Sequence, residues 1–587
     1  MLVFLVDTDF NAQDEPDRSP ETPCDIQALA AARAPILGRG VPDIGRRYER
    51  YLEPPLTVTR KRKPKRKGKN ALNQQIYNAL QETQGSGKLF LPNGQLSKIL
   101  TEQAVLEELE SSLSRYRISE LKEYTEIICH GTRPLEGDDR EPEQYLKIFA
   151  LLVWIGYSKY FPLFFKEGIS DDTLPIELQR GNGRVDLKIR RRDTSTPNDF
   201  SEEYLRCVDG WPPGRKEILW KEQWSFLAPF LEKGGYNNVP HYDLGDEEIL
   251  PFIGRSEVGF GGSSRVFVTK IHPDHHSFRD SVSSSRLHAV KKLISKDEIE
   301  DSEAVFRNEV DILKKFRGHG EHQHIITLLV TYKQFNAFHL VFYLADSNLY
   351  DYWVNKNPQP AMNYNNILWV IQQCQGLADG LSKLHYHETF VQGNGEDQEP
   401  GRRISKYGRH KDIKPQNILW YSSSDGNQGT LKLSDFGASD LKSSASRSNS
   451  GGKAPETFTY RPPERELKFS PIRQSADIWS LGCVFLEFIT WALGGQELWY
   501  SFGQARCSSE DTTTGADGIG EDIFYTVKFE RCVENRIIST VMVKEAVVKV
   551  CIVDNPTCRK RIAFADVSSN SISSTRTTGA RRYSMLS

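Results

Sequence analysis

The feature that most constrains the fold is a pair of polar clusters that lie close together in the second half of the chain. Residues 410–417 read HKDIKPQN, and residues 435–437 read DFG, so Asp435 follows Asn417 by 18 positions. The first cluster places an acid, a lysine and an amide in one short loop, and the second places another acid beside a glycine. One carboxylate can then orient a hydroxyl group while the other holds a magnesium ion.

A second set of motifs precedes these clusters. Residues 259–267 read GFGGSSRVF, and glycines in such a loop let backbone amides approach an anion closely. Lys291 lies in the apolar stretch AVK, where an unpaired buried ammonium would be costly. Strand alternation puts it on the opposite face from Lys292. Glu309 follows 18 residues later on a helical pattern and is the predicted carboxylate partner of Lys291.

The order of these motifs resembles the eukaryotic-type protein kinase family, of the serine/threonine type, over about residues 250–495. The resemblance implies a two-lobed fold, ATP and Mg²⁺ as cofactors, and transfer of the γ-phosphate to protein hydroxyls. It implies catalytic roles for Asp412, Lys414 and Asn417, and metal binding by Asn417 and Asp435. It implies nucleotide binding by Gly259, Gly261, Ser264, Val266, Ala289, Lys291, Glu309, Phe342, Tyr343 and Ala345.

Several positions depart from the family pattern or refine it. Ser264 replaces the third glycine of the loop, and Lys411 replaces an arginine that commonly pairs with a phosphorylated activation segment. Lysine keeps the charge but lacks the bidentate fork, which puts that form of control in doubt. Lys414 and Thr457 match the serine/threonine type. Asp477 matches the aspartate that caps the backbone of the catalytic loop.

The chain is expected to be of the α+β class with five parts. Residues 1–70 are predicted to be disordered, residues 71–178 helical, and residues 179–249 a linker with a Trp-rich docking helix. Residues 250–505 form the predicted kinase domain, and residues 506–587 a divergent or disordered tail. The region before the kinase motifs and the insertion before residue 410 look similar to a filamentous-fungal expansion of such kinases.

Within this outline, the stretch from Gly181 to Thr196 is predicted as a linker, and Trp220, Trp224 and Leu227 as one buried helical face. The insertion from Ile271 to Arg286 is predicted as a polar hairpin tip rather than a metal site, because no cysteine or acid completes a convincing ligand set for its histidines.

Composition limits the partners. Net charge is −2, so a global attraction to nucleic acid is not expected, and nine dispersed cysteines favour a reduced, intracellular protein. The sequence contains no apolar run of 18 residues, so no membrane span is predicted. Eight of the ten residues 60–69 are basic. That run is interpreted as a charged linker, a nuclear-import signal or a contact with nucleic acid or anionic lipid, so the cytoplasm, the nucleus or both are the expected location.

The end of the kinase-like region leaves two functional classes open. Residues 503–522 are polar, and the late arginine that pairs in kinases with the glutamate matching Glu464 has no obvious counterpart. Either the final part of the domain is divergent, or the reading frame or splicing of the tail is altered. An active kinase is the first hypothesis, and a catalytically impaired pseudokinase or scaffold with an incomplete C-terminal lobe is the alternative.

Overall fold

The computed structural model describes residues 4–6, 72–132, 142–180, 187–192, 200–235, 238–260, 264–278, 287–294, 299–316, 321–390, 403–423, 428–443, 458–465, 473–507, 522–529, 539–544 and 547. The chain divides into two compact units. The N-terminal unit comprises Gly45–Ala304 and Leu328–Leu344, and the C-terminal unit comprises Met1–Ile44, Val305–Thr327 and Ala345–Ser587.

The N-terminal unit begins with a helical core. Its helices are α3 (Leu72–Ala79), α4 (Gln95–Ile99), α5 (Glu102–Ser112), α6 (Ile118–His130), α7 (Leu146–Ile155), α8 (Phe161–Lys166) and α9 (Pro213–Glu222). The apolar periodicity of the sequence explains most of this core, because Leu72 and Ile76 are buried four residues apart in α3, as are Val105 and Leu109 in α5. The most apolar helix, α7, lies at its centre with seven of its ten residues buried.

The helical core extends beyond the predicted boundary at residue 178. The stretch predicted as a linker contains β5 (Leu187–Arg192), which is the middle strand between β4 (Glu177–Arg180) and β6 (Phe200–Tyr204). Ile189 is 1% exposed and joins the same hydrophobic cluster as α7. The linker prediction is therefore wrong for this strand, because its basic residues alternate with buried apolar ones.

The predicted Trp-rich helical face is shifted by one position. Helix α9 ends at Glu222 and a 3₁₀ turn follows over Gln223–Phe226. The buried side chains are those of Leu219, Gln223 and Phe226, while Trp220 and Trp224 are only half-buried. Gln223 is buried because its amide bonds both backbone groups of Ile176, at 2.7 and 2.8 Å.

The N-terminal unit also holds a six-stranded sheet in the order β7-β11-β12-β10-β9-β8. The strands are β7 (His241–Asp243), β8 (Phe252–Phe260), β9 (Ser264–Ile271), β10 (His288–Leu293), β11 (Leu328–Gln334) and β12 (Ala337–Tyr343). All pairings are antiparallel except that of β7 with β11. One face of the sheet packs around Val290, Tyr332 and Val341 in a hydrophobic cluster.

The segment after β9 is not the polar hairpin tip that its composition suggests. Residues 273–275 form a 3₁₀ turn, and His275 is completely buried while His272 is 8% exposed. The described residues hold no group of three His, Cys, Asp or Glu side chains suited to a metal ion. Residues 279–286 lie outside the described residues.

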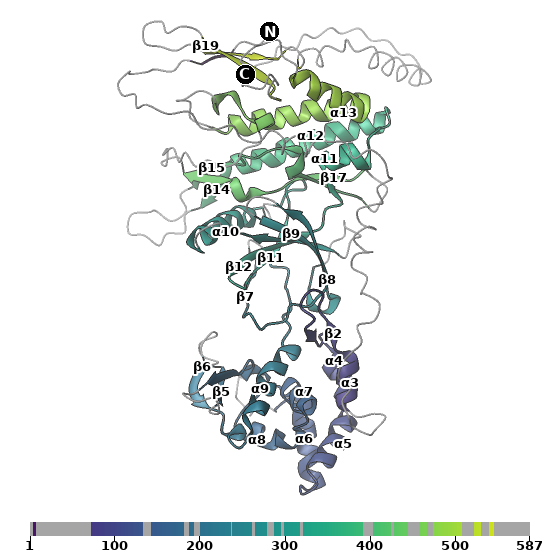
Figure 1. Ribbon diagram of the computed structural model, residues 1–587, viewed down its shortest axis with the longest axis vertical. Coiled ribbons are helices and arrows are strands. Elements are labelled where there is room, and N and C mark those ends of the chain that lie inside the picture. The colour runs from purple at the N-terminus through teal and green to yellow at the C-terminus, as the bar shows by residue number, and fades with distance from the viewer. Residues whose placement is uncertain are drawn as a thin grey trace, which may run out of the picture. The chain divides into compact units, whose positions relative to one another are not determined.

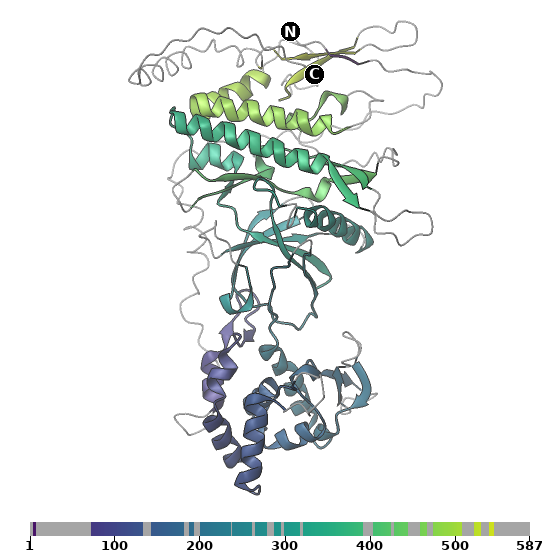
Figure 2. The ribbon, with the colours of Figure 1, turned by 180° about the vertical axis from the view of Figure 1, so that it is seen from behind.

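The C-terminal unit is mainly helical. It contains most of α10 (Ile299–Lys314), then α11 (Leu349–Asp351), α12 (Tyr364–His385) and α13 (Ser475–Cys507). The side chain of Asn363 caps α12 by accepting a hydrogen bond from the backbone N–H of Asn366 at 2.9 Å. Figures 1 and 2 both show α12 and α13 side by side, in the green part of the chain.

Three small sheets accompany these helices. Strands β13 (Ser347–Asn348), β16 (Ile418–Tyr421) and β17 (Thr430–Leu433) form one, and β14 (His387–Phe390), β15 (Arg403–Arg409) and β18 (Asp440–Ser443) form another. The polar insertion before residue 410 thus supplies two strands, β14 and β15, and the latter pairs with residues just after the DFG motif. The mixture of sheets and helices agrees with the predicted α+β class, while the two-lobed arrangement stays a prediction.

The predicted tail contains ordered structure. The third small sheet joins β1 (Phe4–Val6), β20 (Ser539–Val543) and β19 (Tyr525–Phe529), and Phe524 and Tyr525 are buried. Residues 1–70 are predicted to be disordered and residues 506–587 to be divergent or disordered, so β1 corrects the first prediction at Phe4–Val6, while β19 and β20 favour a divergent tail. The remaining residues of the two predicted disordered termini, including the basic run 60–69, lie outside the described residues.

Arg506 fixes this tail to α13. Its Nη2 atom lies 2.7 Å from Glu487 Oε1, and its Nε atom lies 2.9 Å from Asp522 Oδ1. The hydroxyl of Tyr460 donates to the second oxygen of Glu487 at 2.7 Å. Burial raises the pKa of Glu487, and Arg506 opposes that shift. The described partners of Arg506 are therefore Glu487 and Asp522, and a partner for Glu464 that matches the kinase pattern stays unassigned.

Helix α13 is long and apolar enough to cross a membrane by length and composition, with a mean hydropathy of 1.5 in its most apolar window. Three features weaken that interpretation. Just over half of the window, 56%, is buried inside the protein, and Gly495 interrupts the helix at φ 70° and ψ −166°. A buried charged residue, Glu487, also lies within it. A core helix of a folded unit has the same properties.

Acidification should destabilise the N-terminal unit. Burial lowers the pKa of His288 to about 3, with His276 adding repulsion, and lowers that of His339 to about 3, with Arg255 and Lys292 adding theirs. The unfolded chain binds these protons near pH 6.5, so stability is present above that pH and is lost as the pH falls. Each histidine should lower the free energy of unfolding by roughly 2 kcal/mol between pH 6.5 and 5. Denaturant unfolding at several pH values measures this, and a flat profile would contradict it.

Removing the cation of the buried cluster should destabilise the C-terminal unit. Arg506→Met leaves the Glu487 carboxylate 2% exposed without its counterion, so we expect a loss of about 3–5 kcal/mol in the free energy of unfolding. Adding Glu487→Gln should restore part of that loss, because the fully buried carboxylate is then replaced by a neutral amide, while Asp522 still loses its ion pair with Arg506. Urea unfolding of both variants checks this, and a loss below about 1 kcal/mol for the single variant would contradict the account.

Candidate active site

One buried carboxylate binds the backbone of the catalytic-loop segment. Asp477 lies in the first turn of α13 and is 2% exposed. Its Oδ2 accepts the backbone N–H of His410 at 2.7 Å, and its Oδ1 accepts that of Lys411 at 2.8 Å. This confirms the capping role expected of Asp477. The bond also fixes Lys411 at φ 71°, a left-handed conformation that costs energy for a residue other than glycine.

His410 connects this loop to the DFG segment. Its ring is fully buried, and its Nε2 donates to the carbonyl of Ser434 at 3.0 Å. The other ring nitrogen accepts the backbone N–H of Asp412 at 3.4 Å. The ring also lies 4.9 Å from that of Phe436, between centroids. One imidazole therefore sets the distance between the two acidic motifs.

The first acid is fixed by the amide and the lysine of its own motif. Asn417 Nδ2 donates to both the backbone carbonyl and Oδ2 of Asp412, each at 2.8 Å. Lys414 Nζ lies 2.7 Å from the same carboxylate oxygen. Asp412 and Lys414 are only partly exposed, at 16% and 21%. The three residues predicted as catalytic are thus in direct contact, and a carboxylate held so rigidly can orient a nearby hydroxyl group.

The second acid lies just after β17. Asp435 is exposed and takes a left-handed conformation, with φ 63° and ψ 69°. Ser434 ties it to the first motif, because both its N–H and its hydroxyl donate to the carbonyl of Asn417 at 2.9 Å. A strained backbone beside buried, hydrogen-bonded neighbours is often kept for function.

The donor set suits a magnesium ion. The two hydrogen bonds of Asn417 Nδ2 determine the orientation of its amide group, which turns Oδ1 away from Asp412. An amide oxygen together with the carboxylate of Asp435 supplies the hard oxygen ligands that Mg²⁺ prefers. Both residues predicted as metal ligands therefore have chemistry that fits this ion.

Four of the predicted nucleotide-binding residues meet on one face of the sheet in the N-terminal unit. Lys291 is in register with Val266, and Ala289 with Phe342. Directly paired residues in antiparallel strands project to the same side. Leu340 also pairs with Lys291 and was missed because its motif gave no polar signal. Lys292 pairs with His339 and lies on the other face, as strand alternation predicts.

The other predicted nucleotide-binding residues are more scattered. Gly259 is the next-to-last residue of β8, and Ser264 is the first residue of β9. Gly261 lies outside the described residues. The side chain of Tyr343 projects to the face opposite Phe342, against His288, which leaves only its backbone for a ligand. Ala345 belongs to the C-terminal unit.

Glu309 is buried in α10, at 1% exposure, while its neighbour Asp311 is exposed, as their helical spacing predicts. Lys291 and Glu309 belong to different units, so their pairing stays a prediction. Within the C-terminal unit, Asn308 Nδ2 donates to the carbonyl of Ser439 at 2.7 Å. Helix α10 thus contacts the segment after the DFG motif, and the ring of Phe436 lies 6.0 Å from that of Phe316, two residues beyond the end of the helix.

Several residues that shape the site escape sequence reasoning. His385 ends α12, and its Nε2 lies 2.9 Å from Asp477 Oδ2. Gln474 Nε2 donates to the carbonyls of His385 and Gly408, at 2.6 and 3.1 Å. Ser439 Oγ donates to the carbonyl of His410 at 3.1 Å. These side chains lie far apart in sequence and belong to no short motif, so only the fold reveals them.

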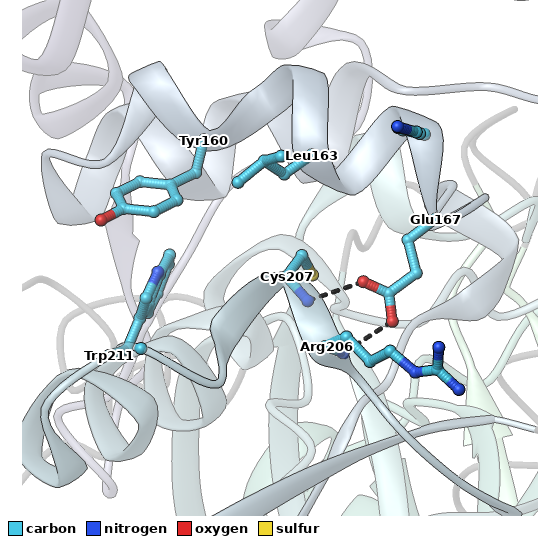
Figure 3. A pocket seen from close by; sticks show the side chains of 8 residues that line it. Tyr160, Leu163, Glu167, Arg206, Cys207 and Trp211 are labelled. Carbon is cyan, nitrogen blue, oxygen red and sulfur yellow. Dashed lines mark hydrogen bonds between the residues drawn. The ribbon is translucent and has the colours of Figure 1, made fainter.

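A separate cavity of about 600 Å³ lies in the helical core of the N-terminal unit (Figure 3). Tyr160 and Glu167 line it from one side, and Cys207 and Trp211 face them from the other. The two carboxylate oxygens of Glu167 accept the backbone N–H groups of Arg206 and Cys207, each at 2.7 Å. Burial raises the pKa of the Cys207 thiol, and Glu167 adds to the effect. The Cys207 thiol is therefore held in its protonated, less nucleophilic form, and both carboxylate oxygens of Glu167 are engaged by backbone donors.

Comparison with known proteins agrees with the site. Residues 256–500 match the family model of the protein kinase domain. Human cyclin-dependent kinase-like 4 is 26% identical over 37% of this chain and 46% of its own length. Calcium/calmodulin-dependent protein kinase type 1 of Caenorhabditis elegans is 26% identical over 39% and 53%. Mitogen-activated protein kinase 3 of rice (Oryza sativa subsp. japonica) is 29% identical over 32% and 44%.

The chain spans about half the length of the curated relatives it matches. The family model covers the segment that contains both acidic motifs and begins after the helical region. The family model and these relatives together support a protein kinase of the eukaryotic type for residues 256–500.

Proposed function

We propose that this protein transfers the γ-phosphoryl group of Mg-ATP to serine or threonine hydroxyls of protein substrates. The observation that carries the proposal is the contact between Asp412, Asn417 and Lys414 at 2.7–2.8 Å, on a loop fixed by Asp477. Phosphoryl transfer depends mainly on positioning and charge stabilisation, and this arrangement supplies both.

The roles of the residues follow from their geometry. Asp412 orients the attacking hydroxyl and accepts its proton, because its carboxylate is fixed by Asn417. Lys414 contributes a positive charge next to that carboxylate, where the transferred phosphoryl group would carry negative charge. Bound magnesium, held by Asn417 and Asp435, would neutralise the phosphate oxygens. Lys291, on the sheet face with Val266, would contact the α- and β-phosphates.

Two observations support serine and threonine as acceptors. Lys414 resembles the residue that serine/threonine kinases have at this position. The relatives found are named cyclin-dependent, calcium/calmodulin-dependent and mitogen-activated protein kinases. The proposal also includes protein substrates and a location in the cytoplasm, the nucleus or both.

The described part of the tail weakens the pseudokinase hypothesis. It rested on an incomplete C-terminal lobe, yet Arg506, Glu487 and Asp522 form a buried cluster that packs Phe524 against α13. A scaffold without activity would not need Asp412 held by two side chains. Activity of the purified protein decides between the two.

Removing the charge of Asp412 should abolish phosphate transfer. Asp412→Asn keeps the shape of the side chain but cannot accept a proton, so we expect the rate to fall about 10²- to 10⁴-fold. Radiolabelled ATP, a mixed protein substrate and phosphoamino-acid analysis measure the rate and the acceptor. Asp311→Asn, which changes an exposed aspartate on α10 in the same way, should retain full activity.

The outcomes separate the hypotheses. Wild-type transfer to serine and threonine, lost in Asp412→Asn but not in Asp311→Asn, supports the proposal. No transfer by folded wild-type protein would favour the pseudokinase. Equal transfer by wild type and Asp412→Asn would show that the observed activity comes from another group or a contaminant.

Neutralising Asp435 should weaken the response to magnesium. Asp435→Asn replaces a charged oxygen ligand with a neutral one, so we expect the magnesium concentration for half-maximal nucleotide binding to rise about tenfold or more. Fluorescent nucleotide binding during a magnesium titration measures this without requiring turnover. An unchanged midpoint would remove Asp435 from the metal site.

A further inference from the structure

The hairpin of β8 and β9 is held at the end opposite its loop. Phe260 pairs with Arg265 next to the glycine-rich loop, and Phe252 pairs with Ile271 at the other end. Strand β8 is the edge of the six-stranded sheet. An exposed edge presents unpaired backbone groups, so its neighbours matter for its position.

Gln84 covers part of that edge. It follows β2 (Gln81–Glu82) and precedes β3 (Leu89–Phe90), and β2 lies next to β8 in Figure 1. The backbone N–H of Gln84 donates to the carbonyl of Phe252 at 3.0 Å. Its side-chain Oε1 accepts the backbone N–H of Arg255 at 2.8 Å. One residue of the helical region thus bonds β8 at two points.

His275 fixes the other strand of the hairpin. It lies four residues after Ile271, and its ring is completely buried. Its Nδ1 donates to the carbonyl of Pro229 at 3.0 Å, and its Nε2 accepts the backbone N–H of Asn93 at 3.1 Å. The ring of Phe90 packs edge-on against His275, at 5.3 Å between centroids.

These contacts lead directly into the helical core. The backbone N–H of Leu91, next to Phe90, donates to the carbonyl of Ser225 at 2.7 Å. Leu91 and Phe226 belong to the hydrophobic cluster of that core. The backbone groups of Leu231 bond those of His275 and Ser277, at 2.8 and 3.1 Å. The helical core and the base of the hairpin therefore lie in one compact unit.

We propose that Gln84 and His275 are positioning residues through which the helical region sets the affinity for ATP. The inference rests on the proposed function. Gly259 and Val266, two of the residues proposed to contact the nucleotide, lie on β8 and β9, so a fixed base of this hairpin reduces the conformational freedom that ATP binding must remove. The residues do not touch the ligand; they hold the two strands that lead to the loop.

Two variants weaken the contact at different points. Gln84→Ala removes the acceptor of the Arg255 N–H but keeps the backbone bond to Phe252. His275→Phe keeps an aromatic ring against Phe90 but removes both hydrogen bonds of the imidazole. Two matched controls are available. Gln81→Ala changes an exposed residue of β2, three residues before Gln84, and His339→Phe changes a buried histidine of β12 in the six-stranded sheet.

The full-length protein is tested by nucleotide affinity, steady-state kinetics and hydrogen exchange. We expect Gln84→Ala and His275→Phe to raise the Kd and KM for ATP about three- to tenfold, to change kcat less than twofold, and to speed exchange over residues 252–271. The proposal is overturned if both variants bind ATP like wild type. It is also overturned if His339→Phe lowers the Tm by the same amount as His275→Phe and weakens ATP binding equally.

The proposed function can fail separately. A wild-type protein that binds no nucleotide would overturn the kinase proposal, and the effect on ATP affinity with it. Hydrogen exchange needs no activity and still decides whether Gln84 and His275 hold the hairpin: unchanged exchange over residues 252–271 in both variants would overturn that role, and faster exchange confined to this hairpin would support it.

Discussion

The Asp477 carboxylate is the point on which the geometry of the candidate site depends. Its two oxygens accept the backbone N–H groups of His410 and Lys411, and one of them also lies 2.9 Å from the ring of His385. Through these bonds α13 and the end of α12 position the catalytic loop, and Asp412 follows within two residues. The carboxylate is almost fully buried, so each bond is shielded from competing water.

The sequence predicts the chemistry of the site better than it predicts the structure that surrounds the site. Short motifs contain Asp412, Lys414 and Asn417, and their side chains do lie in contact. Lys291 could be assigned a sheet face because strands alternate, and its register with Val266 agrees. His385 and Gln474 could not be found, because they reach the loop only through the packing of distant helices.

The corrections have a common physical origin. The stretch around Ile189 has a composition typical of a linker, yet a strand needs only a few alternating apolar residues to join a core. Arg506 and Glu487 lie 19 residues apart on one helix with a break between them, so no fixed spacing reveals their pairing. His275 looked like part of a polar tip, because the hydrogen-bond partners that permit its burial are remote in sequence.

Phosphate transfer by wild-type protein and by Asp477→Asn tests the central claim most directly. Asparagine keeps the size of the side chain but offers one acceptor oxygen instead of two, so one backbone N–H of the loop loses its partner. If the held loop is what makes Asp412 catalytic, the variant should bind ATP normally and transfer phosphate at least tenfold more slowly. Full transfer by the folded variant would contradict the account.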